Sequence, residues 1–369
     1  MPAPRRLLLG PGPSNVPARV LAALAQPLLG HLDPAFLAIA DEVQERLRRL
    51  FGTANRLTIP LASTGSGGME ACFANLVEPG DVALVGVAGV FGERMCDVAA
   101  RQGARVVRIE AEWGRALDED AVAAAIERER PALLAIVHAE TSTGVRQPLE
   151  GIARAARAAE ALLLVDCVTS LGGLPVTLDS WGADAAYAAT QKCLSCPPGL
   201  APASFSERAL ARVARRRAPV PSWYFDLGLL GGYYGERRVY HHTAPVGMIA
   251  GLAEGLRALE EEGIAARIER HARAGAHLRA GLEALGFEPL VAAAERLPML
   301  TAVRLPERVL RADEAALRRR LLDRHGIEVG GGLGKLAGGV WRIGLMGENA
   351  RPEVADRLLG ALREEIGAG

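Results

Sequence analysis

Lysine is almost absent from this 369-residue sequence, although the chain holds 43 basic residues. Lys192 lies in the stretch YAATQKCLSCPPGL, and the only other lysine is Lys335. Arginine serves well as a surface cation, but its guanidinium stays protonated and cannot attack a carbonyl group, whereas a partly desolvated lysine amine can. We therefore interpret Lys192 as a candidate nucleophile, with drift in an arginine-rich chain as the alternative. Lys335 is interpreted as an exposed loop residue.

Two other segments carry groups that could hold a ligand. Asp166 ends the apolar run ALLLVD, where its carboxylate could either meet a ligand or cap the next helix. Upstream, LASTGSGGMEACFANL passes through Thr64, Gly65 and Ser66 into a helix, and such a turn offers free N–H groups and hydroxyls to a phosphate. The spacing of a dinucleotide-binding loop is absent here, and GGGLGKLAGG has Leu336 where a Walker loop needs Ser or Thr.

The phosphate turn, Asp166 and Lys192 are all predicted at one edge of one sheet. Pyridoxal 5'-phosphate requires these three features, because its phosphate is anchored, its ring nitrogen needs an acidic partner and its aldehyde reacts with a lysine amine. We expect Asp166 to keep the ring nitrogen protonated, so that the ring can accept electrons from the substrate. Lys192 would then move a proton between the substrate and the cofactor.

The elements that must position these groups follow from the hydrophobic pattern. From Asp81 to about Phe205, short apolar runs alternate with amphipathic helical segments. This alternation predicts an α/β fold with a mostly parallel sheet that is covered by helices on both faces. Ligands of such sheets bind beyond the carboxyl ends of the strands. The runs assigned as strands are DVALVGV, ARVVRIE, ALLAIVHAE, ALLLVDCV, DAAYAAT and LAPASFS.

The C-terminal part of the chain has a different pattern. A long helical stretch from about Val246 precedes the strand candidates TAVRLP, GIEVGGG and VWRIGLMG. We predict an N-terminal extension over residues 1–17, a large cofactor-binding domain over 18–262 and a small α+β domain over 263–369. Arg342 interrupts the apolar run VWRIGLMG, and a grip on a substrate carboxylate explains this arginine better than an edge strand that faces water.

Charge and composition disfavour several classes of function. The 43 basic residues balance 43 acidic ones, so no overall field attracts the chain to nucleic acid or to an anionic membrane. The apolar run at residues 7–9 is too short for a signal peptide or a membrane span, which predicts a cytoplasmic protein. The odd number of cysteines, five, favours reduced thiols. His241 and His242 lack a second ligand cluster, so no metal site is expected.

Short motifs along the whole chain resemble one family when they are taken in order. They are LLLGPGPSNVP, GHLDPAF, STGSGGMEA, HAETSTGV, VDCVTSLGG, QKCLSCPPG, RRVYHHTAPV and WRIGLMGENA. The family is that of the class V, fold-type I aminotransferases, and the branch is that of the alanine–glyoxylate and serine–pyruvate enzymes. The resemblance implies ping-pong transfer of an amino group from alanine or serine to glyoxylate or pyruvate. It also implies bound pyridoxal phosphate and a homodimer with shared active sites.

The resemblance assigns roles around the cofactor ring. Phe91 matches the aromatic residue that stacks on the pyridine ring, and Val168 matches the residue on the opposite face. Thr141 matches the hydroxyl near the ring oxygen, and Asp166 matches the partner of the ring nitrogen. Gln191, next to the lysine, matches a residue that holds the cofactor.

Further roles concern the phosphate, the neighbouring subunit and the substrate. Tyr240 and Thr243 match residues that reach the phosphate from the other subunit, and Arg342 matches the arginine that grips the substrate carboxylate. Gly12, near the predicted entrance, favours a small substrate. Animal members have His at the position of Ser66 and Trp at that of Phe91, yet serine keeps a hydroxyl and phenylalanine keeps a π-face.

Related activities define the alternatives. A cysteine desulfurase needs a nucleophilic cysteine in the small domain, but no cysteine follows Cys196, and Gln191 stands where those enzymes usually have histidine. Transaminases for 2-aminoethylphosphonate, ureidoglycine or phosphoserine remain open. A pyridoxal-phosphate-binding regulator would need a DNA-binding module, for which the residues before the first motif are too few.

Overall fold

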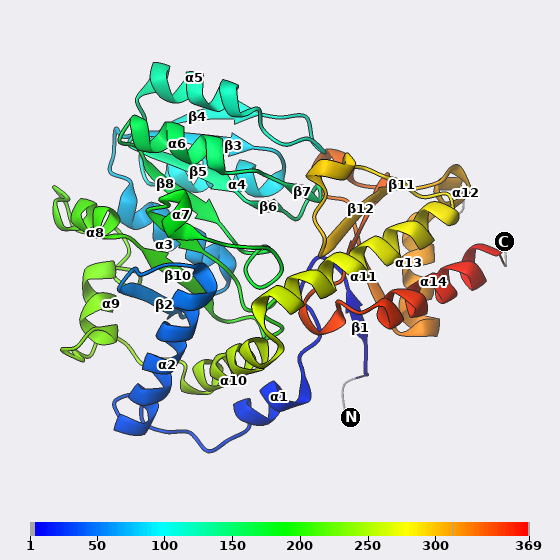
Figure 1. The fold of residues 1–369 in the computed structure, drawn as a ribbon, viewed down its shortest axis with the longest axis horizontal. Helices are drawn as coiled ribbons and strands as arrows, with labels where there is room; N and C mark the ends of the chain where they lie inside the picture. The colour runs from blue at the N-terminus through cyan, green and yellow to red at the C-terminus, as the bar shows by residue number, and fades with distance from the viewer. Residues whose placement is uncertain (1–3, 312, 368–369) are drawn as a thin grey trace.

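A seven-stranded sheet forms the centre of the larger part of the structure, a computed structural model that describes residues 4–311 and 313–367 (Figure 1). Strands β3, β4, β5, β8 and β9 run parallel to their neighbours in this group. In spatial order the sheet consists of β2 (Leu57–Leu61), β10 (Ala201–Phe205), β9 (Ala185–Tyr187), β8 (Leu162–Asp166), β5 (Leu133–Val137), β3 (Val82–Val87) and β4 (Arg105–Glu110).

Burial along these strands explains why the apolar runs became a covered sheet. Every residue of β5 and β8 is buried, as expected for strands packed on both faces, whereas β4 at the sheet edge alternates between exposed and half-buried positions. Helices pack against both faces (Figure 1). They are α2 (Pro34–Phe51), α3 (Gly65–Leu76), α4 (Val90–Arg101), α5 (Glu119–Glu129), α6 (Glu150–Ala158), α7 (Leu178–Trp181), α8 (Glu207–Ala214), α9 (Leu227–Tyr234) and α10 (Val246–Glu262). The predicted α/β class with a mostly parallel sheet is confirmed.

One predicted strand runs against the others. The run LAPASFS forms β10, which is antiparallel to both β9 and β2. A parallel return usually needs a crossover helix, but residues 188–200 between β9 and β10 contain only turns and extended chain, so the chain comes back in the opposite direction. This helix-free connection is the segment that carries Lys192.

A second sheet organises the C-terminal part. Its order is β1 (Leu7–Leu9), β13 (Ile327–Gly331), β14 (Val340–Gly344), β12 (Leu300–Arg304) and β11 (Glu288–Pro289). A separate apolar cluster fills the space between this sheet and its helices, and Trp341 is its largest fully buried side chain. The helices are α11 (Ile264–Ala284), α12 (Glu307–Arg311), α13 (Glu314–His325) and α14 (Pro352–Gly367). Short elements complete the chain: α1 (Ala18–Leu24), β6 (Ala139–Glu140), β7 (Val145–Arg146), η1 (Ala293–Glu295), η2 (Gly334–Leu336) and η3 (Gly347–Asn349).

Two details of this part differ from the simplest reading of the sequence. The N-terminal run forms β1, which pairs with β13, so residues that are far apart in the chain share one sheet. The long helical stretch from Val246 is divided into α10 and α11 at Gly263, whose φ of 84° interrupts the helix. Over the part of the chain that the structure describes, no helix is both long and apolar enough to cross a membrane. The three proposed domain ranges remain predictions.

Candidate active site

A cavity of about 150 Å³ opens where β5, β8 and β9 end and α3 and α4 begin. This is the sheet edge at which ligands of parallel α/β sheets bind. Its walls bring together most of the residues that the sequence singled out. They include Thr64, Gly65, Ser66, Phe91, Thr141, Asp166, Val168, Gln191 and Lys192.

The beginning of α3 lies at one end of this cavity. Thr64 precedes the helix, and no hydrogen bond from its side chain to the first helical turn exists within the described residues. The first N–H groups and the hydroxyls of Thr64 and Ser66 are therefore available to an anion. At Gly65 a Cβ atom would lie 3.0 Å from both Val168 Cγ2 and Ala189 Cβ, so this close approach of the helix to the sheet favours glycine.

Asp166 ends β8 as a buried carboxylate in a fixed position. Its Oδ1 accepts a hydrogen bond from the Val168 N–H at 2.7 Å, and its Oδ2 accepts one from the Tyr187 hydroxyl at 2.6 Å. Burial raises the pKa of Asp166 to about 6, although these hydrogen bonds and the Lys192 charge oppose the increase. The carboxylate orders the turn that follows β8, but the described residues 167–177 contain no helix before α7 begins, so the alternative of a helix cap is wrong. Asp166 also lines the cavity.

Lys192 also lines the cavity, from the connection between β9 and β10. Its side chain is buried, and burial lowers the pKa of its ammonium to about 8. Its Nζ donates a hydrogen bond to Pro11 O. An amine of this kind is neutral more often than an exposed lysine near neutral pH, and it is therefore a better nucleophile. The other lysine, Lys335, is exposed, as expected, and its ammonium lies 4.5 Å from the centre of the Trp113 ring.

The start of α4 supplies a flat face to the cavity. Phe91 lines it, and the guanidinium of Arg94 lies 4.9 Å from the centre of the Phe91 ring. Arg94 also donates a hydrogen bond to the Ser66 hydroxyl at 3.1 Å. The Arg94 guanidinium therefore adds a positive charge beside the start of α3, and the sequence alone did not reveal it.

Arg342 lies on β14 beside the Thr141 loop. This strand is interior to the second sheet and the side chain is 6% exposed, so the alternative of an edge-strand arginine facing water is wrong. Its Nε donates to Gly331 O at 2.8 Å and its Nη1 to Thr141 O at 3.4 Å. Burial lowers the pKa of Arg342, and the nearby Glu140 carboxyl opposes that decrease. The remaining N–H groups can grip a carboxylate.

Glu140 and Tyr187 are site residues that sequence reasoning missed. Burial raises the pKa of Glu140 to about 7, and its Oε1 accepts hydrogen bonds from the Ser142 N–H and hydroxyl. Ser142 in turn accepts a hydrogen bond from the Val90 N–H at the start of α4. A polar residue at the end of an apolar run was the signal available for both, since Glu140 follows β5 closely and Tyr187 ends β9.

Other predicted residues lie apart from the cavity or at its margin. Gly12 contacts the lysine, because a Cβ atom there would lie 2.8 Å from Lys192 Nζ. Tyr240 and Thr243 do not line the cavity of their own chain, as far as the described residues show, and both are exposed in the segment after α9. That placement is compatible with a role toward a second subunit and does not test it.

The cavity has the donors and acceptors that pyridoxal phosphate requires. The phosphate could bind at the start of α3, the ring nitrogen could meet Asp166 and the aldehyde could meet Lys192. Gln191 Oε1 is buried and finds no hydrogen-bond partner among the residues described, so it is free to bind a ligand in the cavity. These residues therefore fit the cofactor.

Comparison with known proteins decides the family. The model of the family described as aminotransferase class-V matches residues 6–355. The chain belongs to this family. An alanine–glyoxylate aminotransferase of Drosophila melanogaster is 41% identical over 368 residues, which cover 98% of this chain and 93% of the relative. The (S)-ureidoglycine–glyoxylate transaminase of Bacillus subtilis is 39% identical and covers 95% of this chain and 88% of its own length.

Comparison with solved structures supports the same family for this class-V aminotransferase. A crystal structure of an alanine–glyoxylate aminotransferase from Nostoc sp. has a TM-score of 0.97 and 51% identity, covering 99% of this chain and 96% of that one. The ureidoglycine–glyoxylate aminotransferase of Bacillus subtilis also reaches 0.97, at 40% identity, covering 100% of this chain and 94% of its own. The predicted family and the predicted aminotransferase activity are confirmed.

Proposed function

We propose that this class-V aminotransferase uses pyridoxal 5'-phosphate to transfer the amino group of a small amino acid, alanine or serine, to glyoxylate or pyruvate. One observation carries the proposal. The desolvated amine of Lys192, the buried carboxylate of Asp166 and the first residues of α3 all line the same cavity. The names of the similar alanine–glyoxylate aminotransferases support glyoxylate as the acceptor.

The residues divide the chemistry between them. Bound pyridoxal phosphate would supply an electron sink for the substrate carbanion. Asp166, held in place by Tyr187 and the Val168 N–H, would keep a proton on the ring nitrogen. Lys192 would bond the cofactor at rest, and its amine would later remove and return the substrate proton. Phe91 and Val168 would enclose the ring from two sides.

Substrate size follows from the surroundings of Lys192 and Arg342. Arg342 is a buried arginine with N–H groups left for one carboxylate. Gly12 packs directly against the lysine amine, which leaves little room for a bulky side chain on the substrate. A donor with a small side chain, such as alanine or serine, suits these dimensions.

A second candidate donor is ureidoglycine, because one of the similar enzymes is named for that substrate at nearly the same identity. The other alternative is 2-aminoethylphosphonate, whose phosphonate could take the place of a carboxylate at Arg342. Both alternatives use the same cofactor and the same lysine. They therefore differ from the proposal only in the donor that reacts.

We further propose a homodimer in which each subunit completes the site of the other. Tyr240 and Thr243 stand on an exposed segment whose neighbouring apolar side chains are unusually open to solvent. Trp223 is 62% exposed, Val239 52% and Tyr240 57%. Trp223 precedes α9, but the centre of its ring lies 4.3 Å from that of His241, so the exposed apolar side chains lie on one part of the surface. Such a surface favours a subunit interface. A monodisperse monomer with full activity would contradict this part of the proposal.

Absorbance spectroscopy with separate amino donors tests the function. Purified protein, incubated with pyridoxal phosphate and freed of excess, should show a visible band that Lys192→Ala lacks. Addition of alanine or serine should convert that band to an absorption at shorter wavelength, and glyoxylate should restore it. If only ureidoglycine or only 2-aminoethylphosphonate converts the band, that compound, and not alanine or serine, is the amino donor. Absence of the band in the wild type would refute the cofactor assignment.

A further inference from the structure

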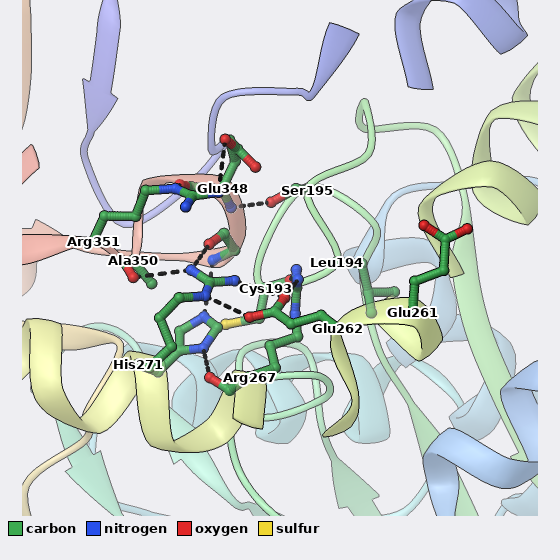
Figure 2. A network of polar contacts seen from close by, with 12 residues as sticks. Cys193, Leu194, Ser195, Glu261, Glu262, Arg267, His271, Glu348, Ala350 and Arg351 are labelled. Carbon is green, nitrogen blue, oxygen red and sulfur yellow. Dashed lines mark hydrogen bonds and ion pairs between the residues drawn. The ribbon is translucent and has the colours of Figure 1, made fainter. Parts of the chain in front are cut away.

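The backbone that follows Lys192 is clamped between α11 and the turn that follows the Arg342 strand (Figure 2). Lys192 belongs to the large sheet's connection, whereas Arg342, α11 and η3 belong to the C-terminal part. The reaction needs the lysine amine and the carboxylate-binding arginine in a constant relative position. The contacts that join the two backbones therefore determine the geometry of the reaction.

Arg267 on α11 contacts the backbone that follows Lys192. Its Nη2 donates a hydrogen bond of 2.6 Å to the carbonyl oxygen of Cys193, the residue next to Lys192. The residue is 7% exposed, and its Nη1 donates a hydrogen bond to Glu262 Oε2 at 2.7 Å. Figure 2 shows Arg267 together with Glu262 and Cys193. The Cys193 carbonyl thus receives a charge-assisted hydrogen bond from a buried guanidinium, which fixes this peptide more firmly than a neutral donor would.

His271 lies one helical turn after Arg267 on α11 and contacts the turn that follows the Arg342 strand. Its ring is fully buried, and burial lowers its pKa to about 3, so the ring is neutral. Its Nδ1 donates to Arg267 O at 2.8 Å, which leaves Nε2 to accept the Gly347 N–H at 2.9 Å. Arg270 adds hydrogen bonds to Gly347 O and Ala350 O at 2.8 and 2.9 Å.

The two backbones also touch each other directly. The Ser195 hydroxyl accepts a hydrogen bond of 2.7 Å from the Glu348 N–H. Gly347 has a φ of 56°, and a Cβ atom there would lie 1.8 Å from Ser195 Oγ and 2.9 Å from Cys193 O. Only glycine permits this approach. Ser195 itself has a φ of 53°, so both chains adopt left-handed backbone where they meet.

Glu262 joins the arginines of the network. Its Oε1 accepts from Arg270 at 2.5 Å and its Oε2 from Arg267 at 2.7 Å. Burial alone would raise the pKa of Glu262, but the hydrogen bonds and charges of the two arginines lower it to about 2. The carboxylate thus stays charged and holds both guanidinium groups in orientation at any ordinary pH.

We propose that Arg267 and His271 are positioning residues for the chemistry at Lys192, because together they lock the peptide after the lysine to the turn after the Arg342 strand. This inference rests on the proposed function, in which Lys192 is the reacting amine. Neither residue lines the cavity, as far as the described residues show, so they act through backbone placement. Loss of the clamp should let the lysine amine move relative to the bound substrate while the substrate still binds.

The test uses Arg267→Met in the full-length, cofactor-loaded enzyme. Its matched control is Arg273→Met, which removes an exposed arginine of the same helix that pairs with Glu269. We expect kcat to fall on the order of 10²-fold, as for misplacement of about 1 Å, while KM for the amino donor stays within about threefold. Arg267→Lys should recover part of kcat, because an ammonium can still donate to the Cys193 carbonyl.

A second readout does not depend on turnover. The apoprotein is mixed with pyridoxal phosphate, quenched with borohydride at intervals, and the modified Lys192 peptide is measured by mass spectrometry. Arg267→Met should capture the cofactor about tenfold more slowly than Arg273→Met, because its amine is misplaced for much of the time. Both experiments run well below the melting temperature of each variant, so lost stability does not enter.

The outcomes separate the two proposals. Equal kcat and equal capture rates for Arg267→Met and Arg273→Met, with only a lower melting temperature for the former, would overturn the positioning role. If Arg267→Met yields no folded protein, His271→Phe decides, because it keeps a buried ring but removes the acceptor of the Gly347 N–H. A kcat and a capture rate equal to those of Arg273→Met would then overturn the role. If the wild type itself shows no reducible adduct at Lys192, the proposed function fails, whatever the Arg267 variants do.

Discussion

Replacement of Lys192 by methionine should stabilise the cofactor-free protein while it abolishes transamination. The ammonium is buried, and its pKa falls from 10.5 to about 8. Each unit corresponds to about 1.4 kcal/mol, so the folded chain carries a penalty on the order of 3 kcal/mol at neutral pH. Methionine keeps the unbranched stem but has no charge. Loss of the hydrogen bond to Pro11 O costs about 1 kcal/mol, which leaves a net gain of about 2 kcal/mol.

Calorimetry of the apoprotein measures this gain. A net 2 kcal/mol corresponds to an increase in Tm of roughly 3 °C for a chain of this length. The pH dependence has a definite sign. Between pH 8 and 10.5 the unfolded lysine holds a proton that the folded lysine has lost, so the wild type gains stability relative to Lys192→Met as pH rises. The advantage of the variant should therefore be largest at pH 7 and smaller at pH 9.5.

The matched control is Lys335→Met, which removes the exposed lysine above Trp113. That variant loses a cation–π contact worth about 0.5 to 1 kcal/mol and should melt slightly lower, not higher. The reasoning is refuted if Lys192→Met melts at or below the wild-type temperature at pH 7. It is also refuted if its advantage is the same at pH 9.5, since the gain would then come from packing and not from the removal of a buried charge.

Three further predictions concern other parts of the site. The rate at which the apoprotein captures pyridoxal phosphate should rise as pH approaches about 8 and then level off, because only the neutral Lys192 amine reacts; stopped-flow absorbance measures it. Asp166→Asn should still bind the cofactor but slow the single-turnover reaction with alanine by about 10²-fold or more, because the charge at the ring nitrogen is lost. Gly347→Ala should lower the Tm of the apoprotein by roughly 1 to 4 °C through about 1 to 3 kcal/mol of strain, because the added methyl would meet Ser195 and Cys193. An unchanged Tm would contradict the close packing seen there.

The sequence alone determined the class of fold and the chemical groups of the site. Apolar runs that alternate with amphipathic helices predict a covered parallel sheet, because strand and helix periodicity are local properties. The sheet edge follows from that pattern, so Asp166 could be placed there from its position at the end of one run. The rarity of lysine and the ordered motifs were also visible without coordinates, and the family and activity that they implied are confirmed.

Only the tertiary structure decided which partners these groups have. Tyr187 meets Asp166 because two parallel strands pair in one register, and sequence spacing does not reveal that register. The reversal of β10 depends on a connection without a helix, which apolar patterning does not distinguish from a parallel return. Arg267 and His271 lie on a helix that looks like any amphipathic surface helix in sequence. Their contacts with residues more than 70 positions away arise only when the two sheets are packed together, because a long-range contact depends on the path of the whole chain between its ends.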